Sequence, residues 1–206
     1  MAMIETTKLT KRYGDVTAVD QVDLEVERGE IHGFVGHNGA GKSTTMRMLV
    51  GLARPTGGEA YIDGEPAGTT AASKKIGYAP QYPEFYETMS GRDYLIYLAK
   101  VADIDAEPAK RADELLEYTG LESVRDQRAS ELGVGERKLV EIARALMTEP
   151  DLILLDEPMA GLPRDVTQDV IEYIQRLREE RTQTFLIVEH DMDVIMNICD
   201  RITVME

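Results

Sequence analysis

The chain has 206 residues, a formal net charge of −15, 43% hydrophobic residues and 30% charged residues. This length allows one domain with a sizeable core, and the composition is ordinary for a globular protein in water. The negative charge disfavours broad binding to nucleic acid or to anionic lipid, because both need clustered lysine and arginine. No apolar run approaches the roughly 18 residues of a membrane helix. With no visible signal peptide and a single cysteine, the sequence predicts a cytosolic protein without an internal disulfide.

The N-terminal part predicts an antiparallel β layer. Alternating segments rich in β-branched residues at 3–9 and 21–27 flank a turn at 13–15. Residues 59–63 predict a further strand before a glycine. We expect these strands to lie beside the glycine-rich loop at 36–43.

A predicted strand, a glycine-rich loop and the start of a helix occupy residues 30–52. The loop reads G-H-N-G-A-G-K-S over 36–43 and fits G-x-x-x-x-G-K-[ST]. Its glycines let backbone N–H groups point at phosphate oxygens, and the helix N-terminus adds a positive dipole. A lysine in this pattern can reach the β- and γ-phosphates, and a serine hydroxyl can ligate Mg²⁺. We therefore expect a nucleoside triphosphate to bind Gly36, His37 (through its backbone), Asn38, Gly39, Ala40, Gly41, Lys42, Ser43 and Thr44.

Helices dominate the predicted middle of the chain. Residues 76–79 predict a short strand that leads to Gln81. The pair Ser90 and Asp93 then fits a capping box, which marks a helix start. Apolar spacing predicts helices over 94–101, 106–118 and 136–147, so residues from about 82 to 148 form a predicted helical insertion.

The last third alternates buried strands with helices. Residues 151–156 and 185–188 are continuous apolar runs, typical of a sheet buried on both faces. Helices are predicted over 165–180 and 191–198, and a final strand over 202–205. Residues 1–206 are therefore predicted to form one α/β domain.

Polar residues follow three of these strands, where open α/β sheets bind ligands. Asp156 and Glu157 end one apolar strand, so one carboxylate can hold Mg²⁺ and the other can polarise an attacking water. Gln81 and His190 follow two other strands. Each of these two residues alone is a weak signal, since a polar residue at a strand end is usually incidental.

Taken together, these residues resemble the ATP-binding-cassette domain of ABC transporters, and the resemblance spans nearly the whole chain. The family's markers occur in the same order along this sequence. They are Tyr13 as the aromatic that stacks on adenine, 36–43 as the phosphate loop, Gln81 in the glutamine loop, 132–137 in the signature position, 152–156 as the Walker B strand, Glu157 as catalytic base and His190 as the switch histidine.

The resemblance implies a P-loop NTPase (RecA-like) core with an antiparallel β subdomain and an inserted α-helical subdomain. It implies that ATP and Mg²⁺ bind, with Ser43, Gln81 and Asp156 around the metal and Glu157, His190, Gln81 and Lys42 in catalysis. Two cassettes would form a head-to-tail dimer, in which Gly133 and Gly135 of one protomer face the ATP of the other.

The resemblance also implies a place in the cell and a set of partners. The subunit would attach to integral membrane subunits at the cytoplasmic face of the cell membrane, and hydrolysis would drive them. Those subunits choose the substrate, which this sequence does not reveal. The aromatic residues Tyr82, Phe85 and Tyr86 either dock a membrane subunit or pack the base of the helical insertion. No nucleic acid is expected as a partner.

Three positions depart from the family pattern. Gly133 replaces a serine, Val134 replaces a glycine, and Pro163 replaces the aspartate of the D-loop. Without the serine hydroxyl, a charge-assisted hydrogen bond to the γ-phosphate across the dimer is lost, at a cost of about 1.5–3 kcal/mol. These positions serve the partner's ATP, so we expect slow hydrolysis in a homodimer, or asymmetric hydrolysis in a heterodimer with a standard partner.

Two alternatives to a transporter subunit stay open. One is a soluble ABC-type ATPase that remodels a protein or ribonucleoprotein, although such proteins often carry two cassettes or an inserted arm. The other is a slow ATP clamp that signals by dimerising, although it would not need Glu157 as a base. Family members usually continue beyond the last predicted strand, so a short or truncated C-terminal end is expected.

Overall fold

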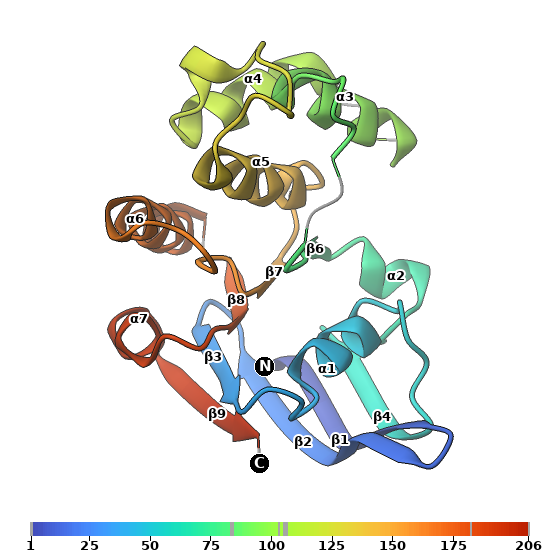
Figure 1. Cartoon of the computed structure of the whole chain (residues 1–206). Helices are drawn as coiled ribbons and strands as arrows, with labels where there is room; N and C mark the ends of the chain where they lie inside the picture. The colour runs from blue at the N-terminus through green and yellow to red at the C-terminus, as the bar shows by residue number, and fades with distance from the viewer. Residues whose placement is uncertain (1, 83–84, 103, 105–106, 182, 206) are drawn as a thin grey trace.

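A parallel β-sheet forms the centre of the protein in its computed structural model, which describes residues 2–82, 85–102, 104, 107–181 and 183–205. The strand order is β6-β7-β8-β3-β9, and every neighbouring pair is parallel. Figure 1 shows helices around this sheet. The strands are β3 (Ile31–Gly36), β6 (Ile76–Ala79), β7 (Leu152–Asp156), β8 (Thr184–Val188) and β9 (Arg201–Met205).

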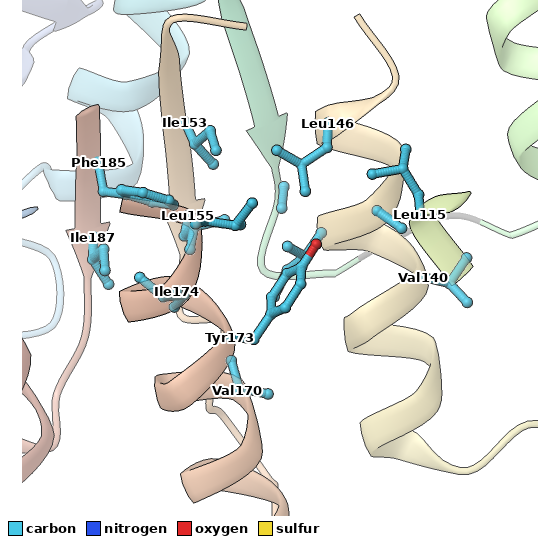
Figure 2. Close-up of a cluster of buried hydrophobic side chains, with 14 of the residues drawn as sticks. Leu115, Val140, Leu146, Ile153, Leu155, Val170, Tyr173, Ile174, Phe185 and Ile187 are labelled. Carbon is cyan, nitrogen blue, oxygen red and sulfur yellow. The ribbon is translucent and has the colours of Figure 1, made fainter. Parts of the chain in front are cut away.

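The apolar strands β7 and β8 are buried on both faces of this sheet. Because side chains alternate along a strand, Ile153 and Leu155 enter one core and Leu152 and Leu154 enter another. The first core is filled by helices α5 (Val134–Leu146), α6 (Arg164–Arg181) and α7 (Met192–Ile198). Figure 2 shows part of it, with Leu155 between strand β8 and the side chains of α6 and α5.

The second core joins the parallel sheet to an antiparallel one. Helix α1 (Lys42–Leu49) contributes Met46, Met48 and Leu49 to it. The antiparallel sheet has the order β2-β1-β4-β5, which confirms the predicted β layer. Its strands are β1 (Ala2–Tyr13), β2 (Val16–Glu27), β4 (Gly57–Ile62) and β5 (Glu65–Pro66), followed by the short helix α2 (Thr70–Ser73).

Strands β1 and β2 are longer than predicted. The apolar alternation ends near residue 9, but the two strands stay paired up to Tyr13 and Val16. Irregular registers interrupt the pairing, and Lys8 and Gln21 have positive φ angles of 47° and 49°. The pairing therefore continues as a twisted hairpin whose side chains are largely outside the core, where hydrophobic periodicity gives no signal.

In the described part of the chain between β6 and β7, the structure has three helices and a short 3₁₀ turn. Ser90 caps the first helix, because its Oγ accepts a hydrogen bond from the Asp93 N–H at 3.0 Å. The predicted start of the second helix, at 106, lies outside the described residues, as do parts of the predicted insertion, whose limits stay a prediction. The elements are α3 (Gly91–Val101), α4 (Pro108–Tyr118), η1 (Glu122–Val124) and α5.

Helix ends differ from the predicted bounds for local reasons. Helix α5 begins at Val134 rather than 136, because the Glu136 carboxylate accepts a hydrogen bond from the Gly133 N–H at 2.7 Å. Helix α1 ends at Leu49 rather than 52, just before Gly51, whose φ is 84°. Among the described residues, no helix combines the length and apolarity needed to cross a membrane.

The fold predicts that the two-sided burial of β7 dominates stability. Leu155→Ala should lower the free energy of unfolding by about 2–5 kcal/mol, because it leaves a cavity between the sheet, α5 and α6. Leu52→Ala is the matched control, since Leu52 is largely exposed. Urea unfolding monitored by circular dichroism measures both values. Equal costs for the two variants would contradict the packing described here.

Candidate nucleotide-binding site

The candidate site lies where four parallel strands end at one edge of the sheet. Strand β3 leads into the loop 36–43, β6 into Gln81, β7 into Glu157, and β8 into His190. Their carboxyl ends meet at one edge because the strands are parallel and adjacent. A cavity of about 420 Å³ there is lined by Ala18, Asn38, Gly39, Gly41, Lys42, Ser43, Thr44, Gln81, Glu157 and His190.

The loop 36–43 closes tightly over the start of α1. Gly41 is the residue before the helix, with φ 98°, and a Cβ there would lie 2.3 Å from the Ala18 carbonyl oxygen. Gly39 has φ 88° but open space around it. Glycine at 41 is therefore required both by backbone conformation and by the close approach of β2.

Lys42 points back at its own loop. Its Nζ donates hydrogen bonds to the carbonyl oxygens of Gly36 at 2.7 Å and His37 at 3.0 Å. Burial lowers the pKa of Lys42, and the carboxylates of Glu157 and Asp156 partly offset that effect. The ammonium is therefore held between the loop and two acids, beside the N-terminus of α1.

Ser43 and Asp156 meet across the sheet edge. The Ser43 Oγ donates a hydrogen bond to Asp156 Oδ1 at 3.1 Å. Burial raises the pKa of Asp156, and the hydrogen bond from Ser43 opposes this rise. A hydroxyl and a carboxylate are hard oxygen donors, and one or two such ligands plus phosphate oxygens suit Mg²⁺. These residues therefore fit the metal that the sequence predicts, and a cation here would offset the cost of burying the carboxylate.

Both oxygens of the Glu157 carboxylate contact side chains that the sequence predicts for the site. Oε2 accepts a hydrogen bond from the Gln81 side-chain amide, and Oε1 lies 2.5 Å from His190 Nε2. Glu157 also has a φ of 52°, a left-handed conformation that costs a residue with a side chain about 1–3 kcal/mol. With this backbone conformation, the Glu157 side chain lines the cavity.

Tyr13, Gly133 and Gly135, which the sequence also predicts for the site, are not among the residues that line this cavity. Tyr13 is 52% exposed near the end of the β1–β2 hairpin, and Lys11 Nζ lies 4.8 Å from its ring centre. Gly133 and Gly135 line a separate groove of about 890 Å³, together with Pro163. The structure therefore does not bring the signature segment to the phosphate loop of its own chain.

The start of α5 explains part of the signature sequence by packing. A Cβ on Gly135 would lie 2.5 Å from the Val166 side chain of α6, so glycine there lets the two helices approach. Gly133 has an ordinary φ of −63°, and a Cβ there would come no closer than 3.4 Å to Glu136. A serine at 133 therefore fits this backbone, whereas a side chain at 135 does not.

Two residues of the site were not predicted. Ala18 lines the cavity from β2, and no sequence signal marks it. Glu189 is 4% exposed, and its carboxylate accepts hydrogen bonds from the backbone N–H groups of Met159 at 2.7 Å and His190 at 3.1 Å. An acid that directly follows a buried apolar strand was a signal for this residue.

The chain belongs to the ABC transporter family. A family model described as ABC transporter matches residues 19–160, which is more than half of the chain. This confirms the resemblance to ATP-binding cassettes. The parallel and antiparallel sheets with their helices confirm the predicted P-loop NTPase fold class.

Curated relatives and a solved structure cover almost the whole chain. The methionine import ATP-binding protein MetN of Staphylococcus saprophyticus is 39% identical over 99% of this chain. The bacitracin transport ATP-binding protein BcrA of Bacillus licheniformis is 37% identical over 97%. The chain spans 63% and 65% of these two relatives, which is less than two thirds of their length. A dimeric ATP-binding cassette in a post-hydrolysis state, bound to ADP and phosphate, superposes with a TM-score of 0.88 at 28% identity, covering 99% of this chain and 94% of that chain.

The geometry of the loop predicts different costs for two glycine substitutions. Each of Gly39→Ala and Gly41→Ala should cost about 1–2 kcal/mol, since both positions have left-handed backbone. Gly41→Ala should cost about 1–3 kcal/mol more, because its Cβ overlaps the Ala18 carbonyl. Denaturant unfolding of the nucleotide-free protein measures the difference. A Gly41→Ala variant as stable as Gly39→Ala would show that the Ala18 carbonyl of β2 does not exclude a Cβ at position 41.

Proposed function

We propose that the chain binds ATP with Mg²⁺ and hydrolyses it as the ATP-binding subunit of an ABC transporter. The observation that carries this proposal is the placement of Glu157 between Gln81 and His190 at the phosphate-loop cavity. A loop that only bound nucleotide would not need a carboxylate held in strained backbone beside it.

In the proposed reaction, backbone N–H groups of the loop and the Lys42 ammonium hold the β- and γ-phosphates. Ser43 and Asp156 would hold Mg²⁺, which neutralises charge on the phosphate oxygens when it is bound. Glu157 accepts a proton from the attacking water as the oxygen of that water forms a bond to the γ-phosphorus. The bond from that phosphorus to the β–γ bridging oxygen breaks, which releases ADP and phosphate. Gln81 and His190 orient the carboxylate and the water.

We propose that a second protomer completes the site. Gly133 and Gly135 line the groove beside Pro163 and do not line the cavity of their own chain, which leaves them available to a partner's ATP. The dimeric relative with ADP and phosphate supports this arrangement. Val134, at the start of α5, is 58% exposed and would meet the partner's phosphates first. In this arrangement, the departures at Gly133, Val134 and Pro163 act on the partner's site.

We also propose that integral membrane subunits dock beside the glutamine loop, with the chain at the cytoplasmic face of the membrane. Tyr82 is 79% exposed, and with Phe85 it lines a shallow cavity of about 310 Å³. Phe85 packs against the core and against Tyr94, with ring centres 5.1 Å apart. Of the two interpretations of this aromatic group, packing suits Phe85 and docking suits Tyr82, since exposed aromatics are common binding hot spots.

Glu157→Gln should lower the rate of ATP hydrolysis by about 10²–10⁴-fold, because an amide does not accept the proton of the attacking water. Affinity for ATP should be kept, since the amide has nearly the same shape. Phosphate release and a fluorescent ATP analogue measure the two quantities. Hydrolysis at the original rate would overturn the role of Glu157 and with it the proposed reaction.

The same variant tests the transporter role by trapping the ATP-bound complex in native membranes. Affinity purification of Glu157→Gln should recover a polytopic membrane protein. Recovery of soluble partners alone would favour the alternative of a remodelling ATPase. A second cassette in the eluate would identify a heterodimer, and its absence would favour a homodimer.

Restoring the signature tests whether it limits hydrolysis. Gly133→Ser with Val134→Gly should raise the rate by about tenfold or more, because the serine hydroxyl adds a hydrogen bond to the partner's phosphate. Gly133→Ala with Val134→Gly is the matched control, which adds a Cβ without a hydroxyl. Steady-state phosphate release measures both. Equal rates in the two variants would show that the missing hydroxyl does not slow this enzyme.

A further inference from the structure

A buried lysine lies directly behind the candidate hydrolytic groups. Lys138, in the second turn of α5, is 8% exposed. Its Nζ donates hydrogen bonds to the carbonyl oxygens of Gln81 at 2.8 Å and Glu157 at 3.2 Å. One ammonium group therefore joins two loops that follow different strands, β6 and β7.

These two carbonyls belong to residues whose side chains face each other in the cavity. The Glu157 backbone is left-handed. Its N–H donates a hydrogen bond to the Val188 carbonyl oxygen. Its carbonyl oxygen accepts hydrogen bonds from the Ala160 N–H at 3.2 Å and from Lys138 Nζ. The Gln81 carbonyl is held by Lys138 while the Gln81 amide reaches the Glu157 carboxylate. The ammonium thus fixes the spacing of the two loops.

Burial of a charge needs compensation, and the surroundings supply it. Burial lowers the pKa of Lys138, and four carboxylates from three elements oppose this effect, Glu189 most strongly and then Glu141, Glu157 and Asp156. Glu189 follows β8 and also holds the N–H groups of Met159 and His190. A buried charged lysine costs stability unless it is both surrounded by acids and hydrogen-bonded. Here it has both, and its hydrogen bonds go to the backbone of the two site residues.

We propose that Lys138 is a positioning residue for ATP hydrolysis, which holds the backbones of Gln81 and Glu157 so that their side chains meet beside the γ-phosphate. This rests on the proposed role of Glu157. This role would place both functions on one helix. The N-terminus of α5 carries Gly133–Gly135, which serve the partner's ATP, and the next turn carries Lys138, which orders this chain's own site. A lysine that only filled a gap in the core would affect stability without affecting catalysis.

The test compares Lys138→Met with Lys75→Met in the full chain. Methionine keeps the length of the side chain and removes its hydrogen bonds. Lys75 is a matched control, because its Nζ also donates to partly buried oxygens, at Asp63, outside the cavity. Lys138→Met should lower kcat by about 10–100-fold at unchanged KM for ATP, the effect of misplacing a catalytic group by about 1 Å. Rates are expressed per nucleotide-binding site, counted with a fluorescent ATP analogue.

A second readout does not depend on activity. Amide hydrogen exchange in the segment after β7, at 157–161, should be faster in Lys138→Met than in Lys75→Met, because the Glu157 turn loses one of its hydrogen bonds. Should the methionine variant fail to fold, Lys138→Gln replaces it, since its shorter side chain keeps a donor but does not span both carbonyls. The same fall in kcat at unchanged KM is expected.

The outcomes separate this inference from the proposed function. An unchanged kcat per site, or a loss that only follows the number of folded molecules, overturns the role of Lys138, while Glu157→Gln still lowers the rate of hydrolysis. Full activity in Glu157→Gln overturns the proposed reaction instead. A fall in kcat with unchanged KM and faster exchange at 157–161, absent from Lys75→Met, supports Lys138 as a positioning residue.

Discussion

The parallel pairing of adjacent strands is the constraint on which the rest of this protein depends. Because β6, β7, β8 and β3 run in one direction, the residues that follow them meet at a single edge of the sheet. The phosphate loop, Gln81, Glu157 and His190 come from distant parts of the chain, and no local interaction brings them together. Their convergence follows from the hydrogen-bonded order of the strands and from the apolar cores on both faces of the sheet.

The same edge concentrates charge that would be unfavourable elsewhere. Asp156, Glu189 and Lys138 are all buried, and burial raises the pKa of the two acids and lowers that of the lysine. Each of these three side chains has a hydrogen-bond partner in a loop of the site. These hydrogen bonds offset part of the free-energy cost of burial and order the loops. The strained φ of Glu157 persists under such restraint. Stability and the geometry of the candidate site are therefore coupled in this region.

Helix α5 connects the two surfaces on which the proposed function depends. Residues at its start line a groove with Pro163 and Val166, and none of them lines the phosphate-loop cavity. Its buried side packs on the sheet and reaches the backbones of Gln81 and Glu157 through Lys138. Relatives of this chain are named for methionine import and for bacitracin transport, so the cassette architecture itself does not fix the transported substrate.

The sequence by itself determined the fold class and predicted most residues of the candidate site, because phosphate-loop and buried-strand sequences have local patterns: glycines at fixed spacing, and apolar runs that end in polar residues. Tertiary structure alone decided how those residues relate in space. It placed Ala18 against Gly41, separated Gly133 from the phosphate loop, and put Lys138 and Glu189 behind Glu157. These contacts join residues far apart in the chain, and a long-range backbone hydrogen bond has no periodicity or spacing from which it can be predicted.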